Sequence, residues 1–129
     1  MLLNVYGLCK SFKGKQILNQ VNFHVDQKEV VSLLGQSGAG KTTILRCVTG
    51  LEKADRGTIC VDGKYVCRDD GKNITYAGKK ELYEIRRSMG MVFQSYHLFP
   101  HMTVLDNVTL ALINVHKMPK EEAVKVAEE

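Results

Sequence analysis

One stretch in the first half of the sequence limits the possible folds more than any other. The run Val30–Leu34 is mostly apolar and does not alternate, which is typical of a strand covered on both faces in a central parallel sheet. The glycine-rich loop Gly35–Thr42 follows at once, and helically spaced apolar residues then precede Gly50, which favours a helix that ends there. These apolar residues are Ile44, Leu45 and Val48. The stretch therefore predicts a strand, a glycine loop and a helix in direct succession.

The loop has the pattern G-x-x-x-x-G-K-[ST], which binds phosphate groups between a strand and a helix. Glycine allows the backbone to turn successive N–H groups toward an anion, and the positive end of the following helix adds to the attraction. Lys41 can reach the β- and γ-phosphates, the Thr42 hydroxyl is the expected Mg²⁺ ligand, and Thr43 can donate near the α-phosphate. The sequence predicts an ATP site formed by Gly35, Gln36, Ser37, Gly38, Ala39, Gly40, Lys41, Thr42 and Thr43.

Two β-hairpins are expected on either side of this stretch. Apolar and polar residues alternate in Leu3–Val5 and in Val21–Val25, around the turn-like Lys13-Gly14-Lys15, which predicts an antiparallel pair. Asp62-Gly63 lies between the short β-like runs 58–61 and 64–66, and Asp-Gly is a strong signal for a two-residue turn. Antiparallel strands therefore lie both before and after the phosphate loop in the sequence.

The remainder of the chain is predicted to be mainly helical. A polar connection over 68–78 leads to a helix near Lys80–Ser88 and then to a short buried strand, Met91–Phe93. Thr103 is a suitable N-cap, and Pro119 favours the start of a last helix. The face that the helix after Thr103 is expected to bury consists of Leu105, Val108 and Leu112.

Composition excludes several other kinds of protein. The 129 residues carry a net charge of +4 with no run of basic side chains, so nucleic-acid binding gains no support. No apolar stretch approaches the roughly 20 residues that cross a bilayer, and we expect a soluble, cytoplasmic chain. The cysteines form no C-x-x-C pair and are expected to be small buried apolar side chains rather than a zinc site. Pro100 between His97 and His101 favours a loop over a helical metal site.

Four segments together resemble the ATP-binding subunit of an ABC transporter, in particular the polar amino acid uptake group. They are Lys10-Ser11-Phe12, Leu45-Arg46-Cys47-Val48, Gly57-Thr58-Ile59 and the block GMVFQSYHLFPHMTVLDNV at 90–108. The resemblance implies an α/β fold: a phosphate-loop NTPase (RecA-like) core with an N-terminal antiparallel β-subdomain. It also implies that residues 1–129 are the N-terminal part of one ATP-binding domain, which uses ATP and Mg²⁺.

The resemblance also implies roles for individual residues. Phe12 matches the aromatic residue that stacks on adenine, and Gln94 matches the glutamine that contacts Mg²⁺ and the attacking water. Lys41 and Gln94 are then the catalytic candidates, and Thr42 and Gln94 the metal ligands. The segment Ser95–Thr103 resembles the surface that grips a helix of the membrane permease subunit, which implies a peripheral location on the cytoplasmic face of the cell membrane.

Nothing in the sequence matches the L-S-G-G-Q signature, the strand that ends in Asp-Glu (Walker B), or the switch histidine of this family. We therefore expect the N-terminal half of such a domain, which binds ATP but hydrolyses it very weakly and which pairs with a second ATP-binding subunit in the complete protein. Without its partner strand, Val30–Leu34 would be an unpaired apolar edge. Asp69, Asp70 and Asp106 are the carboxylates to consider if the chain does hydrolyse ATP.

Three other functions are also considered. The first is a nucleotide-binding module without turnover. The second is an ABC-type ATPase that acts on chromatin or ribosomes, which the absence of a basic stripe disfavours. The third is a small phosphate-loop kinase, in which neither the hairpin carrying Phe12 nor the strand ending in Gln94 is expected.

Overall fold

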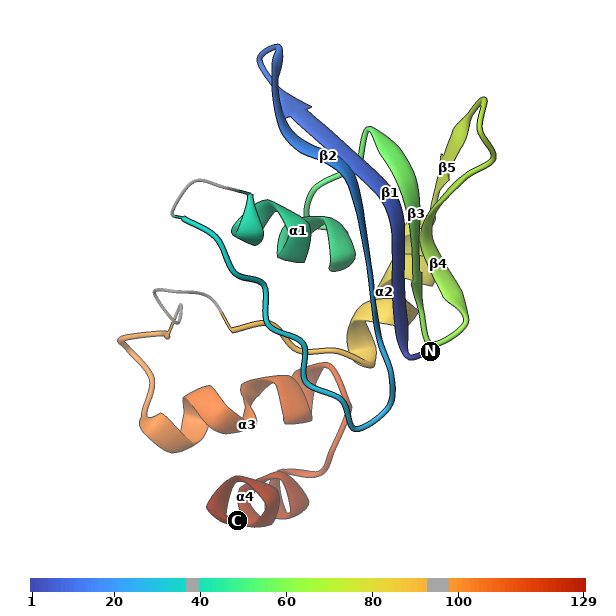
Figure 1. The fold of residues 1–129 in the computed structure, drawn as a ribbon. Helices are drawn as coiled ribbons and strands as arrows, with labels where there is room; N and C mark the ends of the chain where they lie inside the picture. Colours follow the sequence, from blue (N-terminus) through green and yellow to red (C-terminus); the bar gives the residue numbers. More distant parts are fainter. Residues whose placement is uncertain (37–39, 93–97) are drawn as a thin grey trace. The chain divides into compact units, whose positions relative to one another are not determined.

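The computed structural model describes residues 1–36, 40–92 and 98–129. The chain divides into two units, Met1–Met89 and Gly90–Glu129 (Figure 1). In the described residues, the first unit contains a sheet and two helices, and the second contains two helices. Within the described ranges, no helix is both long enough and apolar enough to cross a membrane.

The first unit is built on an antiparallel sheet with the strand order β2-β1-β3-β4-β5. Its strands are β1 (Leu3–Phe12), β2 (Lys15–Val25), β3 (Arg56–Val61), β4 (Lys64–Asp69) and β5 (Ile74–Tyr76). Strand β1 lies between β2 and β3, so that Val5 is paired with Phe23 on one side and with Ile59 on the other. The predicted antiparallel pair is confirmed, while β5 was missed because its three residues lie within a polar connection.

Two-residue turns join the strands of both predicted hairpins. Lys13 and Gly14 have φ angles of 49° and 78°, and Asp62 and Gly63 have φ angles of 48° and 81°. Two successive positive φ angles define the turn that matches the twist of antiparallel strands. Both hairpins are therefore confirmed.

Two helices complete the first unit, α1 (Lys41–Val48) and α2 (Lys79–Arg87). Helix α1 buries Ile44, Cys47 and Val48, and α2 buries Ile85. These side chains join one core with residues of the sheet, among them Val5, Leu8, Leu18 and Ile59. The predicted helix after the glycine loop is confirmed, and of its helically spaced apolar residues Ile44 and Val48 are buried while Leu45 is 46% exposed.

The predicted strand Val30–Leu34 is wrong, because residues 26–36 form no regular secondary structure. Val30 is 91% exposed and Leu34 is 93% exposed, while Leu33 packs against the core. In the described part of the chain, no strand lies beside this segment. Its backbone groups therefore have no ladder partner, and a parallel strand is stable only with one.

The second unit consists of α3 (Val104–Asn114) and α4 (Lys120–Glu128). Thr103 caps α3, since its Oγ1 accepts a hydrogen bond from the Asp106 backbone N at 3.0 Å. Pro119 is the N-cap of α4. Both predicted starts are confirmed.

Two predictions for this unit are wrong. Leu105 and Val108 are 40% and 50% exposed, and α3 instead buries Thr109. A helix buries the side that packs against other elements. In α3 that side contains Thr109 and is not the apolar side of Leu105 and Val108. Met91 and Val92 form no strand, and Val92 is 80% exposed. Phe93 lies outside the described residues.

The glycine at position 57 generates a test of the sheet. A Cβ there would lie 2.8 Å from both Gly7 O and Leu8 Cα, at a φ of +112°. Gly57→Ala should lower the free energy of unfolding by about 3 kcal/mol or more, because backbone overlap adds to conformational strain. Gly63→Ala is the control, since its φ is +81° but its Cβ would meet nothing within 4 Å, and it should cost only about 1 kcal/mol. Equal losses in urea unfolding would contradict this packing.

Candidate nucleotide-binding site

Gly40 fixes the start of α1 against strand β2. Its φ is 95°, and a Cβ on it would lie 2.8 Å from Leu18 Cδ2 and 3.0 Å from Ile17 Cγ2. The Gly40 carbonyl accepts the first helical hydrogen bond, from Ile44 N at 2.9 Å. Only glycine suits both the conformation and the space here. The last glycine of the predicted loop therefore sets where the helix begins.

The amino end of α1 suits an anion. No described side chain caps it, and its first turn contains no acidic residue. Unpaired N–H groups and the helix dipole attract negative charge at such an end. Lys41, the first helical residue, donates a hydrogen bond from Nζ to the Gly35 carbonyl, at the opposite end of the loop. The lysine therefore connects the two ends of the loop.

The structure brings together only part of the predicted phosphate site. Gly35, Gly40 and Lys41 are joined as described above, Thr42 is exposed, and Thr43 is partly buried. Gln36, another residue of the predicted site, is exposed. The predicted residues that lie outside the described ranges are Ser37, Gly38, Ala39 and Gln94.

Phe12 ends strand β1, at the β1–β2 hairpin whose strand β2 meets the start of α1 (Figure 1). Phe12 is 40% exposed, and Lys10 Nζ lies 5.2 Å from the centroid of its ring. Lys10 is paired across the strands with Leu18, the residue that contacts Gly40. The aromatic ring and the phosphate loop are therefore linked through two neighbouring strands, which is compatible with one ligand reaching both.

Asp69 and Asp70, two of the three carboxylates considered as a base, are held by backbone N–H groups instead. Asp69 accepts hydrogen bonds from Gly57 N and Gly71 N, each at 2.9 Å, and from Arg56 Nη2 at 2.6 Å. The backbone bonds, with the Arg56 charge, hold the pKa of Asp69 below its usual range. Hydrogen bonds from Asn73 N and Lys72 N do the same for the pKa of Asp70. Both are therefore weak proton acceptors with a structural role.

The cysteines are confirmed mainly as buried side chains. Cys9, Cys47 and Cys67 are buried, and Cys60 is partly buried. Burial raises the pKa of the Cys47 thiol to about 11 and also raises the pKa of Cys67. These thiols therefore stay protonated and unreactive at neutral pH. The described ranges contain no group of three or more His, Cys, Asp or Glu side chains placed to hold a metal.

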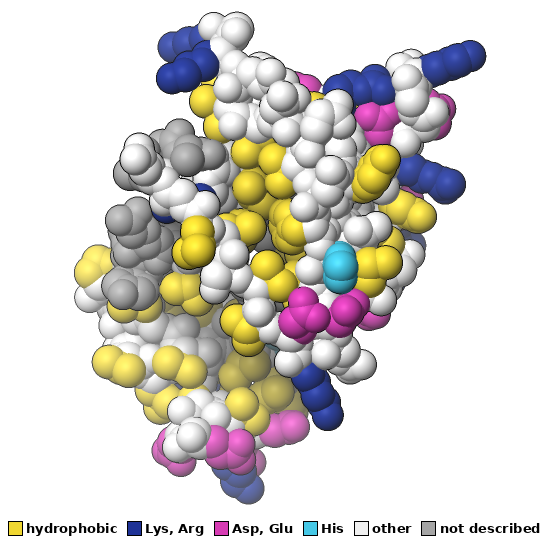
Figure 2. Space-filling model, viewed as in Figure 1, with side chains coloured by type: hydrophobic (Ala, Val, Ile, Leu, Met, Phe, Trp, Pro, Cys, Tyr) yellow, Lys and Arg dark blue, Asp and Glu magenta, His cyan; other side chains and the backbone are white. Residues whose placement is uncertain are grey.

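The segment before α3 presents apolar side chains. Leu98 is 68% exposed and Phe99 is 45% exposed, and Figure 2 shows further hydrophobic side chains on the surface over α3. Asn107 holds the turn: its Oδ1 accepts from Phe99 N at 2.8 Å, and its Nδ2 donates to Thr103 O at 2.8 Å. Sequence reasoning missed this clamp. The described part of Ser95–Thr103, from 98 to 103, is thus an ordered turn with an apolar surface.

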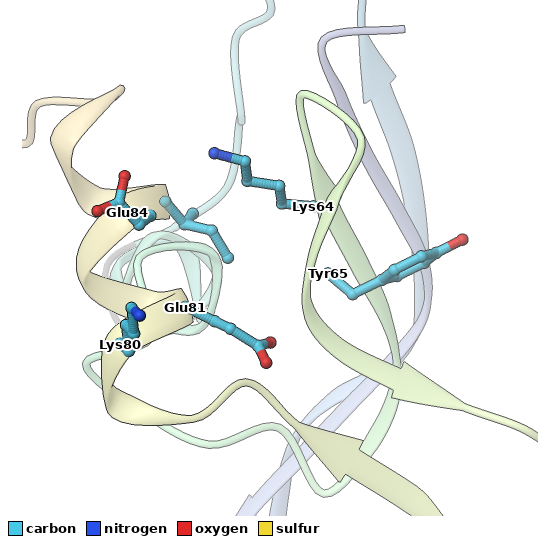
Figure 3. Close-up of a pocket in the computed structure, with 6 residues that line it drawn as sticks. Lys64, Tyr65, Lys80, Glu81 and Glu84 are labelled. Atoms are coloured by element: carbon cyan, nitrogen blue, oxygen red, sulfur yellow. The ribbon is translucent and has the colours of Figure 1, made fainter.

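A pocket of about 410 Å³ lies between β4 and α2. It is lined by Lys64, Tyr65, Lys80, Glu81, Glu84 and Ile85. Figure 3 shows that the Tyr65 ring points away from α2 and that the charged groups do not converge on one point. None of these residues belongs to the predicted nucleotide site, and the pocket is separate from it.

Comparison with known proteins decides the family. Residues 18–129 match the family model described as ABC transporter. The chain belongs to the ABC transporter family. This finding confirms the resemblance drawn from the motifs and is incompatible with a small kinase.

This ABC transporter chain is similar to several curated proteins along nearly its whole length. It is 42% identical over 126 residues to the L-cystine import ATP-binding protein TcyC of Bacillus subtilis (strain 168), covering 98% of this chain and 49% of that protein. It is 40% identical over 123 residues to the histidine/lysine/arginine/ornithine transport ATP-binding protein HisP of Escherichia coli (strain K12), covering 94% and 48%. The chain therefore spans about half the length of the curated relatives it matches.

The fold is similar to solved ATP-binding cassettes. The dimeric, post-hydrolysis structure of the cassette MJ0796 bound to ADP and Pi superposes with a TM-score of 0.80 at 33% identity, covering 98% of this chain and 54% of that one. A further MJ0796 dimer gives a TM-score of 0.78. The α/β fold class with an N-terminal antiparallel sheet is confirmed by these likenesses, although its parallel strand is not formed in the described residues.

The packing of Gly40 generates a test of the site. Gly40→Ala should lower the free energy of unfolding by about 1–3 kcal/mol and weaken ATP binding, because strain and overlap displace the start of α1. Gly78→Ala is a matched control: Gly78 also precedes a lysine at a helix start, but its φ is −70° and a Cβ there would meet nothing within 4 Å. Urea unfolding and ATP titration compare the two. Equal behaviour of both variants would contradict the role given to Gly40.

Proposed function

We propose that this chain is the ATP-binding half of the ATPase subunit of an ABC importer for polar amino acids. The arrangement of Gly35, Gly40 and Lys41 at the start of α1 is the observation that carries the proposal. Relatives named for the import of cystine and for the transport of basic amino acids support the substrate class.

In this proposal the phosphates of ATP replace the Gly35 carbonyl as the partner of Lys41. The ammonium then swings from the backbone oxygen to the β- and γ-phosphates, and the N–H groups at the start of α1 bind the remaining oxygens. Thr42, which is exposed, would hold Mg²⁺ together with Gln94. The cation would neutralise part of the phosphate charge. Phe12 would hold the adenine ring.

The partners are proposed from the surface of the second unit. The turn with exposed Leu98 and Phe99 is the part of Ser95–Thr103 that would contact the permease. Burial of such exposed apolar side chains beneath a partner removes them from water, which stabilises the complex. The complete protein would lie at the cytoplasmic face of the membrane and pair with a second ATP-binding subunit, as the named dimer of MJ0796 does.

The first prediction from this proposal concerns the phosphates. Lys41→Ala should weaken ATP binding by about ten- to a hundred-fold, since it removes a charge-assisted contact worth about 1.5–3 kcal/mol. Lys79→Ala is the matched control, because Lys79 also follows a glycine at the first position of a helix. Titration with a fluorescent ATP analogue measures both affinities. Unchanged affinity in a folded Lys41→Ala variant would refute the site.

The second prediction concerns the base. Phe12→Ala should cost about 1–3 kcal/mol in ATP binding, the range for base–aromatic stacking, and leave the binding of inorganic triphosphate unchanged. Tyr6→Ala serves as the control, because Tyr6 is an exposed aromatic side chain on the same strand. An equal loss for both ligands would show that Phe12 acts through the fold.

The third prediction concerns turnover. The 129-residue chain should release phosphate from ATP at close to the background rate, because Asp69 and Asp70 are held by backbone N–H groups and do not serve as a general base. A phosphate-release assay measures this rate. The proposal would be contradicted if the chain hydrolyses ATP and this activity is abolished by Asp69→Asn, Asp70→Asn or Asp106→Asn. Tight ATP binding without hydrolysis also fits a nucleotide-binding module without turnover.

A further inference from the structure

Lys10 occupies an unusual position beside the candidate adenine residue. Its side chain is only 11% exposed, and its Nζ lies 3.4 Å from Asp55 Oδ1 and 3.5 Å from Glu52 Oε1. The same ammonium lies over the Phe12 ring, 5.2 Å from its centroid. The Lys10 ammonium therefore interacts with two carboxylates and one aromatic ring.

The Asp55 carboxylate and the backbone of Glu52 are themselves held by hydrogen bonds. Asp55 Oδ2 accepts a hydrogen bond from Ser11 N at 2.7 Å, and Asp55 N donates to Cys9 O at 2.9 Å. Asp55 thus contacts three successive residues of β1, at 9, 10 and 11. Glu52 N donates to Arg46 O of α1 at 3.1 Å. The ammonium of Lys10 is therefore held from the connection between α1 and β3.

The charge of Lys10 persists at neutral pH. Partial burial acts to lower its pKa, but the hydrogen bond and charge of Asp55, followed by the charge of Glu52, raise the pKa above its usual value. A cation held over an aromatic ring is attracted by its π-electrons, which restricts the ring. Phe12 otherwise stands at the end of a strand next to an exposed turn.

We propose that Lys10 is a positioning residue of the adenine site: held by Asp55 and Glu52, it fixes the Phe12 ring so that the exposed part of the ring receives the base. This inference rests on the proposed function of Phe12. A ring fixed in advance loses less side-chain freedom when a ligand stacks on it, which strengthens binding. Lys10 therefore contributes to the binding of adenine nucleotides without contacting the phosphates.

The experiment compares ATP with inorganic triphosphate, which offers phosphates but no base. Lys10→Met keeps the length of the side chain and removes its charge. It should weaken ATP binding by about two- to tenfold, the cost of immobilising one side chain, and leave triphosphate binding unchanged. Lys10→Arg keeps the cation and should restore most of the ATP affinity.

Lys53→Met is the matched control. Lys53 Nζ lies over the Tyr76 ring, 5.0 Å from its centroid, and belongs to the same connection between α1 and β3. Its loss removes a similar pair elsewhere in the unit and should change neither affinity. Asp55→Asn is a milder second variant, because an amide oxygen can still accept from Ser11 N. It should weaken ATP binding less than Lys10→Met does.

A double variant separates this inference from the proposal on which it rests. Lys10→Met combined with Phe12→Ala should bind ATP no more weakly than Phe12→Ala alone, because Lys10 acts only through the ring. Additive losses, or equal losses for ATP and triphosphate in Lys10→Met, would overturn the role of Lys10 and leave Phe12 in place. A Phe12→Ala variant with full ATP affinity would instead remove the adenine platform itself.

Discussion

The close approach of Gly40 to strand β2 is the contact on which the nucleotide site depends. It allows the first turn of α1 to pack on Ile17 and Leu18, so that the amino end of the helix meets the β1–β2 hairpin. A side chain at position 40 would push these elements apart. Because Lys41 is the next residue, the same contact also sets where its ammonium can reach. The packing of Gly40 against β2 thus determines where the charge of Lys41 lies.

Local rules account for the elements that the sequence predicted well. The turns at Lys13-Gly14 and Asp62-Gly63 have the positive φ angles that their residue types favour, and the Thr103 cap uses only residues within one helical turn. Val30–Leu34 failed because a strand also needs a neighbour, which no local pattern specifies. The buried side of α3 failed for the same reason, since packing partners decide which side of a helix is covered.

In the candidate site too, features set by neighbouring residues in the sequence could be predicted, whereas contacts between distant residues could not. The glycine pattern and Lys41 are recognised from eight consecutive residues, and the structure places Gly35 and Lys41 in contact. The link from Lys10 to Asp55 joins residues 45 positions apart, and it is visible only in the structure, which places Asp55 beside the β1 residue Lys10. Asn107 was likewise overlooked, because its contacts depend on the path of the turn before α3 rather than on a sequence motif.

The charges of the first unit favour an anion at the amino end of α1. Several of the acidic side chains of this unit form hydrogen bonds or ion pairs away from that end. Asp69, the last residue of β4, and Asp70 in the turn that follows are held by backbone N–H groups. Glu52 and Asp55, which follow α1 in the sequence, are paired with Lys10. The first turn of α1 carries no carboxylate and begins with Lys41. A like charge within a few ångströms would oppose a triphosphate, whereas distant and neutralised carboxylates have little effect. The start of α1 therefore combines a lysine with the absence of a carboxylate in its first turn, at the point where the glycine loop meets the helix.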